Sequence, residues 1–145
     1  MGLSTGLALP RFVSLKSTKI NVRRGPSQDH EVMWVFERKG LPVEVIAEFD
    51  HWRQVRDQEG DTGWIFHSLL DGKRTAMIEG EANGDDFKPL YETPNAQADV
   101  VALTEPGVIG ALLACEKAWC RLSVSGHTGW IARSDLWGVY DGEQF

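Results

Sequence analysis

The chain has 145 residues, enough for one ordinary domain or two small ones, and 42% of them are hydrophobic and 25% charged, as in typical globular proteins. No apolar run approaches the roughly 20 residues that a membrane-spanning helix needs. The formal net charge of −6 is uneven, because residues 1–74 sum to +1 and residues 75–145 to −7, and this acidic second half repels phosphate backbones. We therefore expect no membrane span and no nucleic-acid partner.

The N-terminal segment, residues 1–11, is expected to be a tail before the first folded module. Its opening, MGLSTGLALP, lacks a basic start and a long apolar core, so it is not a complete signal peptide. It fits either a native start or a chain from which a signal has been removed.

Residues 12–72 are predicted to form a first module of short strands. The strands are KINVR (19–23), EVMWVFE (31–37), PVEVIAEF (42–49), WRQVRD (52–57) and TGWIF (62–66), separated by turns that contain Gly, Pro and Asp. The following HSLL (67–70) is expected to form one helical turn.

Alternation within these strands predicts which side chains point inward. In 19–23, Ile20 and Val22 should face the core while Asn21 and Arg23 face outward. In 42–49, the face with Val43, Val45 and Ala47 should be opposite to the face with Glu44, Ile46 and Glu48.

Residues 73–87 are expected to connect this module to a second one. Within them, EGEANGDD (79–86) is predicted to be a solvated linker. RTAMI (74–78) is apolar enough either to form one more strand or to pack on a module.

Residues 88–145 are predicted to repeat the plan of the first module and to end in a C-terminal tail. Its elements are PLYE, VVALTE, GVIGALLA, AWCRLSV and TGWIA, followed by RSDL. The segment GVIGALLACE (107–116) resembles a helix in composition, but the repeat register and the Trp-led strand that follows predict a strand.

The two halves share landmarks in the same order at near-equal spacing. Thr-Gly-Trp-Ile occurs at residues 62–65 and 128–131, and Trp52 and Trp119 precede the repeated tryptophan by 12 and 11 residues. The chain is therefore predicted to be an all-β tandem duplication. Because modules of this size are marginally stable alone, we expect the two to pack against each other, with Trp137, Val139 and Tyr140 in the interface.

The motifs INVRRGPS (20–27), LPVEVIAEFDHWRQVRD (41–57) and GDTGWIFHSLL (60–70) together resemble the bacterial Src-homology-3-like (SH3b) domain family. The resemblance covers nearly all of residues 12–70 and implies a small, strongly bent barrel of five or six strands. The second copy is similar only in part, because LYETPNA stands where the family has Asn-Val-Arg-x-Gly-Pro. The resemblance therefore implies two tandem SH3-like β-barrels, and carries no binding role for this motif into the second.

The resemblance also implies a class of function. The family is associated with cell-envelope targeting and with recognition of peptidoglycan or peptides, and the tail LWGVY is similar to that of a subgroup of exported Gram-negative proteins. We therefore expect a non-catalytic binding module, periplasmic or otherwise exported, with peptidoglycan or a peptide as ligand and no cofactor. Alternatives are an adaptor or sensor that uses the seam between the modules, an accessory domain of a cell-wall hydrolase, and a cytoplasmic location.

Cys115 and Cys120 are candidates for a disulfide. The repeat places Cys115 at the end of one strand and Cys120 just inside the next, where they can face each other across a hairpin. Such a bond would stabilise the module by roughly 2 kcal/mol and indicates an oxidising compartment. The alternative is a pair of reduced, half-buried thiols in a cytosolic protein.

The same residues are weak candidates for catalysis or metal binding. Cys120 and His127 are the residue types of a cysteine hydrolase, but that nucleophile sits at a helix N-terminus and Cys120 is predicted in a strand. Zinc needs about four ligands, whereas Cys115, Cys120 and His127 supply three. We therefore assign no catalytic residue and no metal site.

Aromatic side chains are the better candidates for ligand contacts, because a flat ring with a polar edge suits a sugar face, a peptide backbone or a proline ring. Trp34 is expected on the surface because it is out of phase with Met33 and Val35. The alternative for Trp64 and Trp130 is packing in the core or at the module interface. The preceding glycines, Gly63 and Gly129, are expected to permit close approach of a neighbour. The full candidate set is Trp34, Trp52, Trp64, Tyr91, Trp119 and Trp130.

Overall fold

The computed structural model describes residues 1–81 and 86–145. The chain divides into two compact units, Met1–Lys73 and Arg74–Phe145, and each is described by itself. Half of the predicted linker at 79–86 falls on residues 82–85 and lies outside the described residues.

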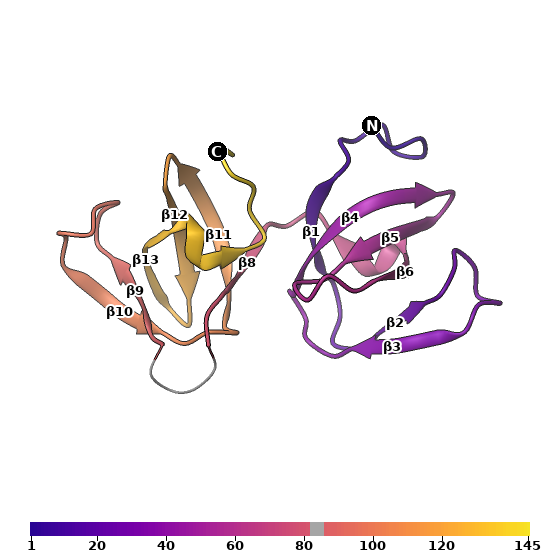
Figure 1. The fold of residues 1–145 in the computed structure, drawn as a ribbon, viewed down its shortest axis with the longest axis horizontal. Coiled ribbons are helices and arrows are strands. Elements are labelled where there is room, and N and C mark those ends of the chain that lie inside the picture. Colours follow the sequence, from indigo (N-terminus) through magenta and orange to yellow (C-terminus); the bar gives the residue numbers. More distant parts are fainter. Residues whose placement is uncertain (82–85) are drawn as a thin grey trace. The chain divides into compact units, whose positions relative to one another are not determined.

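The first unit is a single antiparallel sheet curled around its own core (Figure 1). Its strand order is β3-β2-β6-β5-β4-β1-β7. The strands predicted between residues 19 and 66 are all present, each within one residue of its expected ends, and HSLL forms the predicted turn. The elements are β1 (Arg11–Leu15), β2 (Ile20–Arg23), β3 (Val32–Phe36), β4 (Pro42–Phe49), β5 (Trp52–Arg56), β6 (Thr62–Phe66), the 3-10 turn η1 (His67–Leu69) and β7 (Leu70–Asp71).

The second unit repeats this arrangement. Its strand order, β10-β9-β13-β12-β11-β8-β14, is the first order with every number raised by seven, which confirms the tandem duplication. Residues 109–116 form a strand, as predicted. Within the described residues, no helix is long and apolar enough to cross a bilayer. The elements are β8 (Thr75–Ile78), β9 (Lys88–Tyr91), β10 (Val100–Thr104), β11 (Ile109–Glu116), β12 (Trp119–Val124), β13 (His127–Ala132), the 3-10 turn η2 (Arg133–Asp135) and β14 (Leu136–Trp137).

The segment assigned as a connection contains the strand β8, so RTAMI takes the first of its two predicted alternatives. Met77 pairs with Ile109 of β11, and Ile78 pairs with Leu136 of β14. β1 has the same place in the first sheet, between β4 and β7, and it begins at Arg11 in the predicted tail. Each barrel is therefore completed by a strand that precedes its family-like motifs.

Each unit buries its own aliphatic core. Ile20 and Val22 are fully buried, whereas Asn21 is exposed and Arg23 half-buried, as alternation predicts. Val139 packs against the core of the second barrel, and the expected packing between the modules stays a prediction. The core residues are Val13, Leu15, Ile20, Val22, Val43, Val45, Val55 and Ile65 in the first barrel and Ala76, Ile78, Leu90, Leu112, Cys115, Cys120, Leu122, Val124, Ile131 and Leu136 in the second.

The outer half of β4 departs from the predicted alternation. A register shift between Val45 and Ala47 marks a bulge in the β4–β5 pair. Beyond the bulge the faces are exchanged, so that the Glu48 side chain is 0% exposed while Phe49 is 60% exposed. The prediction that Glu48 lies on the face opposite Val45 is therefore wrong, because the extra residue reverses the alternation.

The repeated Gly-Trp-Ile marks a point of close strand approach. A Cβ atom on Gly129 would lie 2.9 Å from both the Cβ atom of Leu90 and the carbonyl oxygen of Tyr91, and a Cβ atom on Gly63 would overlap Val22, which confirms the expected role of both glycines. The isoleucines that follow are fully buried. Trp64 and Trp130 are half-buried and outside both cores, so the structure does not support core packing for them.

Candidate functional site

Three neighbouring strands of the first barrel, β2, β6 and β5, present one outward face. Trp64 pairs with Arg23 on one side and with Gln54 on the other. Phe66, which follows Trp64 by two residues in β6, pairs with Trp52 of β5. Because side chains alternate along a strand, all five leave the sheet on the side opposite its buried aliphatic residues.

This face is hollowed beside β2 into a groove of about 260 Å³, which we name the β2 groove. Its lining contains two cationic side chains, two amides, three apolar residues and no carboxylate. The lining residues are Lys19, Asn21, Arg23, Gln28, Trp52, Phe66 and Leu69. The β2 groove therefore offers a ligand both positively charged side chains and an apolar surface.

Trp52 and Phe66 form the aromatic wall of the β2 groove. Their ring centroids are 5.4 Å apart and their planes are inclined by 80°, an edge-to-face arrangement worth about 0.5–1.5 kcal/mol beyond burial. The His67 ring lies 5.0 Å from Phe66 and 5.4 Å from His51, which extends the cluster along the surface. Both wall residues are half-buried, so part of each ring faces solvent.

The loop that follows β2 positions Arg23. Its Nη1 atom donates to the carbonyl oxygens of Gln28 at 3.2 Å and His30 at 3.0 Å. The Ser27 hydroxyl lies 2.8 Å from the His30 ring, which holds the same loop. In the described part of the chain no carboxylate pairs with Arg23, so its charge is available to an anionic ligand group.

The corresponding face of the second barrel has its cation at another position, because the exposed Arg121 pairs with Trp130 where Gln54 pairs with Trp64. Tyr91 pairs with Trp130 where Arg23 pairs with Trp64, and Ala132 takes the place of Phe66 opposite Trp119. The Tyr91 and Trp119 rings are 5.7 Å apart and nearly perpendicular. The structure thus brings together three predicted aromatics in the second barrel and two, Trp52 and Trp64, in the first.

Trp34 does not join either group. It pairs with the inward-facing Val22 and packs against the core of the first barrel, where its ring lies edge-to-face with Phe36 at 5.7 Å. Its neighbours Val32 and Met33 are the exposed residues of β3. The expected surface position of Trp34 is therefore wrong, because Trp34 is the direct partner of the inward-facing Val22; the register shift of this pair begins only beyond it, between Val22 and Arg23.

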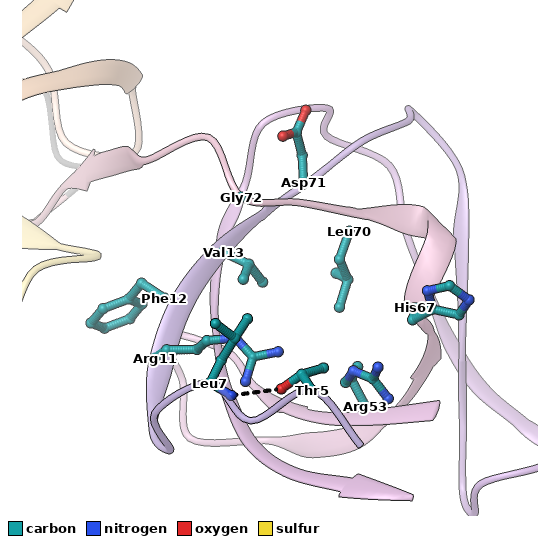
Figure 2. Close-up of a pocket in the computed structure, with 10 residues that line it drawn as sticks. All are labelled: Thr5, Leu7, Arg11, Phe12, Val13, Arg53, His67, Leu70, Asp71 and Gly72. Atoms are coloured by element: carbon teal, nitrogen blue, oxygen red, sulfur yellow. Dashed lines mark hydrogen bonds between the residues drawn. The ribbon is translucent and has the colours of Figure 1, made fainter. Parts of the chain in front are cut away.

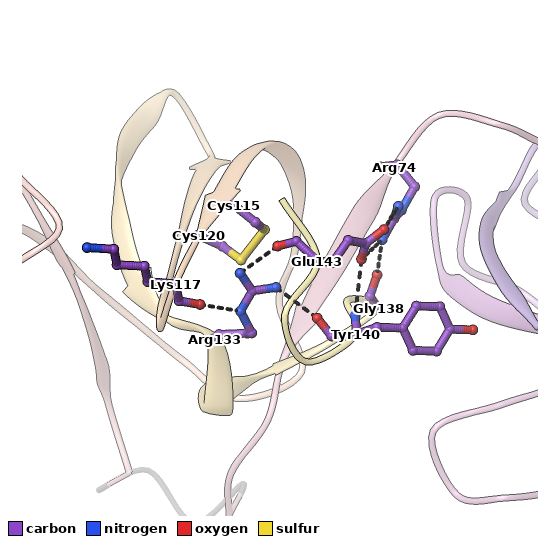
Figure 3. The surroundings of a disulfide bond; sticks show 8 residues. All are labelled: Arg74, Cys115, Lys117, Cys120, Arg133, Gly138, Tyr140 and Glu143. Atoms are coloured by element: carbon purple, nitrogen blue, oxygen red, sulfur yellow. Dashed lines mark hydrogen bonds and ion pairs between the residues drawn. A yellow bond between two sulfur atoms is a disulfide. The ribbon is translucent and has the colours of Figure 1, made fainter. Parts of the chain in front are cut away.

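Cys115 and Cys120 form the predicted disulfide (Figure 3). They are directly paired residues of the β11–β12 hairpin, and both are buried. Phe145 exchanges two backbone hydrogen bonds with Cys115, of 3.0 and 3.1 Å, which attaches the end of the chain to β11 at the disulfide. Since neither thiol is free, Cys120 cannot act as a thiolate nucleophile with His127 in this form.

Sequence reasoning identified Trp52 but not most of the residues around it. The pairing of β5 with β6 was a usable signal, because it places Phe66 opposite Trp52. Lys19 precedes β2 and Gln28 follows it, and both reach the groove through the path of their loops. A single sequence does not specify that path.

The comparison with protein-family models agrees with this fold. The bacterial SH3 domain model matches residues 16–72 and 84–138, and no curated protein matches the chain. Similar solved structures are NlpC2 and NlpC1 from Trichomonas vaginalis and an NlpC/P60 family protein from Bacillus cereus ATCC 10987, at 12, 14 and 10% identity and TM-scores of 0.39, 0.39 and 0.38. The matches cover 91, 94 and 90% of this chain but 49, 48 and 57% of those structures, so the chain spans about half their length. The two domain matches span more than half of the sequence, and the chain therefore belongs to the bacterial SH3 domain family.

Proposed function

We propose that this chain is a non-catalytic binding module of the bacterial cell envelope and that its β2 groove binds a peptide, with the peptide part of peptidoglycan as first candidate. Bacterial SH3 domains are binding modules and are generally non-catalytic. A disulfide is typical of proteins outside the cytoplasm, which supports an exported location. The observation that carries the proposal is the Trp52–Phe66 wall beside the cations Lys19 and Arg23, in a groove whose lining contains no carboxylate.

The groove chemistry suits an extended peptide that carries a carboxylate. The amides of Asn21 and Gln28 can each donate to and accept from a peptide backbone. Lys19 and Arg23 can pair with a carboxylate, and the aromatic wall can cover an aliphatic side chain or a sugar face. In the second barrel the Tyr91–Trp119 pair offers stacking surface, and we propose that it binds an uncharged part of the same ligand.

Retention of the full chain on purified peptidoglycan sacculi tests the proposal. Lys19→Glu reverses a charge on an exposed residue of the groove, and Lys16→Glu makes the same change on an exposed residue outside it. We expect the wild type and the Lys16→Glu variant to be retained equally and the Lys19→Glu variant about tenfold less. Equal retention of the two variants would remove the β2 groove from the binding surface, and no retention of the wild type would favour the adaptor alternative.

A further inference from the structure

We propose that a second pocket in the first barrel binds a small aliphatic carboxylate. The pocket has a volume of about 370 Å³ and lies between the N-terminal loop (residues 2–7), β1 and the η1–β7 segment; we name it the loop pocket (Figure 2). It shares no lining residue with the β2 groove, so it is a separate site. Its volume is within the range of small-molecule sites. The lining residues are Thr5, Leu7, Arg11, Phe12, Val13, Arg53, His67, Leu70, Asp71 and Gly72.

The wall supplied by the N-terminal loop is held in place by Glu48. The carboxylate accepts hydrogen bonds from the backbone amides of Ser4 and Thr5, both at 3.1 Å, and from the Thr5 hydroxyl at 2.7 Å. The same hydroxyl accepts a bond from the amide of Leu7 at 3.0 Å, and the Gly2 amide donates to the Leu7 carbonyl at 2.7 Å. Thr5 and Leu7 are therefore fixed at the edge of the loop pocket.

The floor of the loop pocket has an excess of positive charge. Two guanidinium groups share the single Glu48 carboxylate: Arg11 Nη1 lies 2.9 Å and Arg53 Nε 3.7 Å from Oε2. The pKa of Glu48 is lowered to about 2, so the carboxylate is ionised at neutral pH and the three groups sum to one positive charge. Within the described residues, neither Nη2 atom has an acceptor, so both are free to donate to a bound anion.

Asp71 does not neutralise this charge. Its Oδ1 atom accepts a hydrogen bond from the backbone amide of Lys73 at 3.0 Å, and its carboxylate points away from Arg11 and Arg53 (Figure 2). An anionic ligand group would therefore complete the charge balance of the floor. A monovalent carboxylate matches the excess of one charge, and a guanidinium is suited to bind it through paired hydrogen bonds.

The rest of the ligand must be aliphatic, because Val13 and Leu70 point into the space above the two arginines and Leu7 borders it (Figure 2). A ligand with a carboxylate next to a branched aliphatic group would place the carboxylate against the arginines and the aliphatic group against Val13 and Leu70. This group could be a free small acid or the carboxyl terminus of a peptide that ends in an aliphatic residue. Both ligands would present the same carboxylate and aliphatic group to the pocket. They differ because a peptide would continue out of the pocket into solvent and a free acid would not.

N-acetylleucine is the probe that tests the loop pocket, added to the 15N-labelled full chain and followed by two-dimensional NMR. We expect saturable shifts at the amides of Thr5, Leu7, Val13 and Gly72. N-acetylleucinamide, which lacks the charge, and acetate, which lacks the aliphatic group, should bind at least about tenfold more weakly. Equal affinity for either control would overturn the proposal. Competition by acetyl-Gly-Gly-leucine would identify a peptide terminus as the source, and its failure would identify a free acid.

Two variants of the N-terminal loop provide a matched comparison. Leu7→Asp places a negative charge at the pocket edge, and Leu3→Asp makes the same change outside the lining; both residues are exposed, at 54% and 99%, so neither change removes a core side chain. We expect N-acetylleucine to bind the Leu3→Asp variant normally and the Leu7→Asp variant at least about tenfold more weakly. Equal binding by both variants, or shifts confined to the β2 groove, would refute the site. Lys19→Glu should leave this binding unchanged, which separates it from the proposed function.

Discussion

Protonation of Glu48 should destabilise the first barrel and leave the second unaffected. Burial alone raises the pKa of this carboxyl, but hydrogen bonds from Thr5 and Arg11 and from the backbone amides of Thr5 and Ser4 outweigh burial and lower the pKa from 4.5 to about 2. Because the folded-state pKa is depressed, ionised Glu48 stabilises the fold above the unfolded pKa. This stabilisation is lost as the pH falls from about 5 to about 2.

The size of the effect follows from the difference between the two pKa values, which corresponds to about 3 kcal/mol in the free energy of unfolding. Glu48→Gln removes the charge at every pH while it keeps the side chain's size. We expect this variant to destabilise the first barrel by about 3 kcal/mol at pH 7, with the difference from wild type shrinking towards zero near pH 2.

Urea unfolding followed by the indole N–H signals in NMR measures each barrel separately. Trp52 and Trp64 report the first barrel, and Trp119 and Trp130 report the second, which serves as an internal control. A difference between variant and wild type that does not change with pH would refute the assigned pKa. An equal loss in both barrels would refute the local role of Glu48. A loss confined to the amides of the N-terminal loop would mean that the carboxylate holds that loop without stabilising the sheet.

Three further predictions concern local stability. Replacement of Cys115 and Cys120 by Ala should cost the second barrel roughly 2 kcal/mol, because the bond closes a short loop in the unfolded chain; an unchanged urea midpoint for that barrel would contradict it. Gly129→Ala should cost about 1–3 kcal/mol through overlap with β9, whereas Gly72→Ala, which meets nothing within 4 Å, should be neutral in the same assay. Arg133→Met should speed amide exchange in the C-terminal tail, because this buried guanidinium donates to three carbonyl oxygens (Figure 3); unchanged exchange would count against that anchor.

The sequence was sufficient for the strands between residues 19 and 66 and for the duplication, because alternation and turn residues are local signals; it did not predict β1 and left β8 as one of two alternatives. It also predicted the disulfide, since the repeat aligned Cys115 with Cys120 across a hairpin. The buried position of Glu48 was not predictable in this way. The bulge in β4 adds one residue to the strand, and no distinctive residue type marks its position in the sequence. Every side chain beyond the bulge then points to the opposite face of the sheet from the one that alternation predicts.

The same limit applies to the candidate sites. Trp52 was identifiable as an aromatic on a predicted strand, but the β2 groove also depends on loop paths, and the loop pocket depends on contacts between residues 43 or 44 positions apart in the chain. Sequence periodicity contains no information on contacts of that range. Three-dimensional coordinates are needed to see that Arg11 and Arg53 share one carboxylate.

The two barrels use different chemistry at one equivalent hairpin position. Glu48 and Arg53 are directly paired across β4–β5, and Cys115 and Cys120 are directly paired across β11–β12. A terminal segment is hydrogen-bonded to one member of each pair: the N-terminal loop to the Glu48 carboxylate and Phe145 to the Cys115 backbone. An ion pair in the first barrel and a disulfide in the second therefore link the same two positions of the equivalent hairpins.

Because both links lie on the buried side of their hairpins, neither depends on the outward face of the sheet. The outward faces were thus free to diverge after duplication without loss of the core. One face has Arg23 and Phe66 where the other has Tyr91 and Ala132. A ligand group that pairs with Arg23 in the first barrel would meet Tyr91 at the equivalent position of the second, where the cation, Arg121, takes the position of Gln54 instead. We therefore expect the two barrels to recognise different groups, because Arg23 lies beside Trp64 in the first barrel whereas Arg121 lies beside Trp130 and Tyr91 replaces Arg23 in the second.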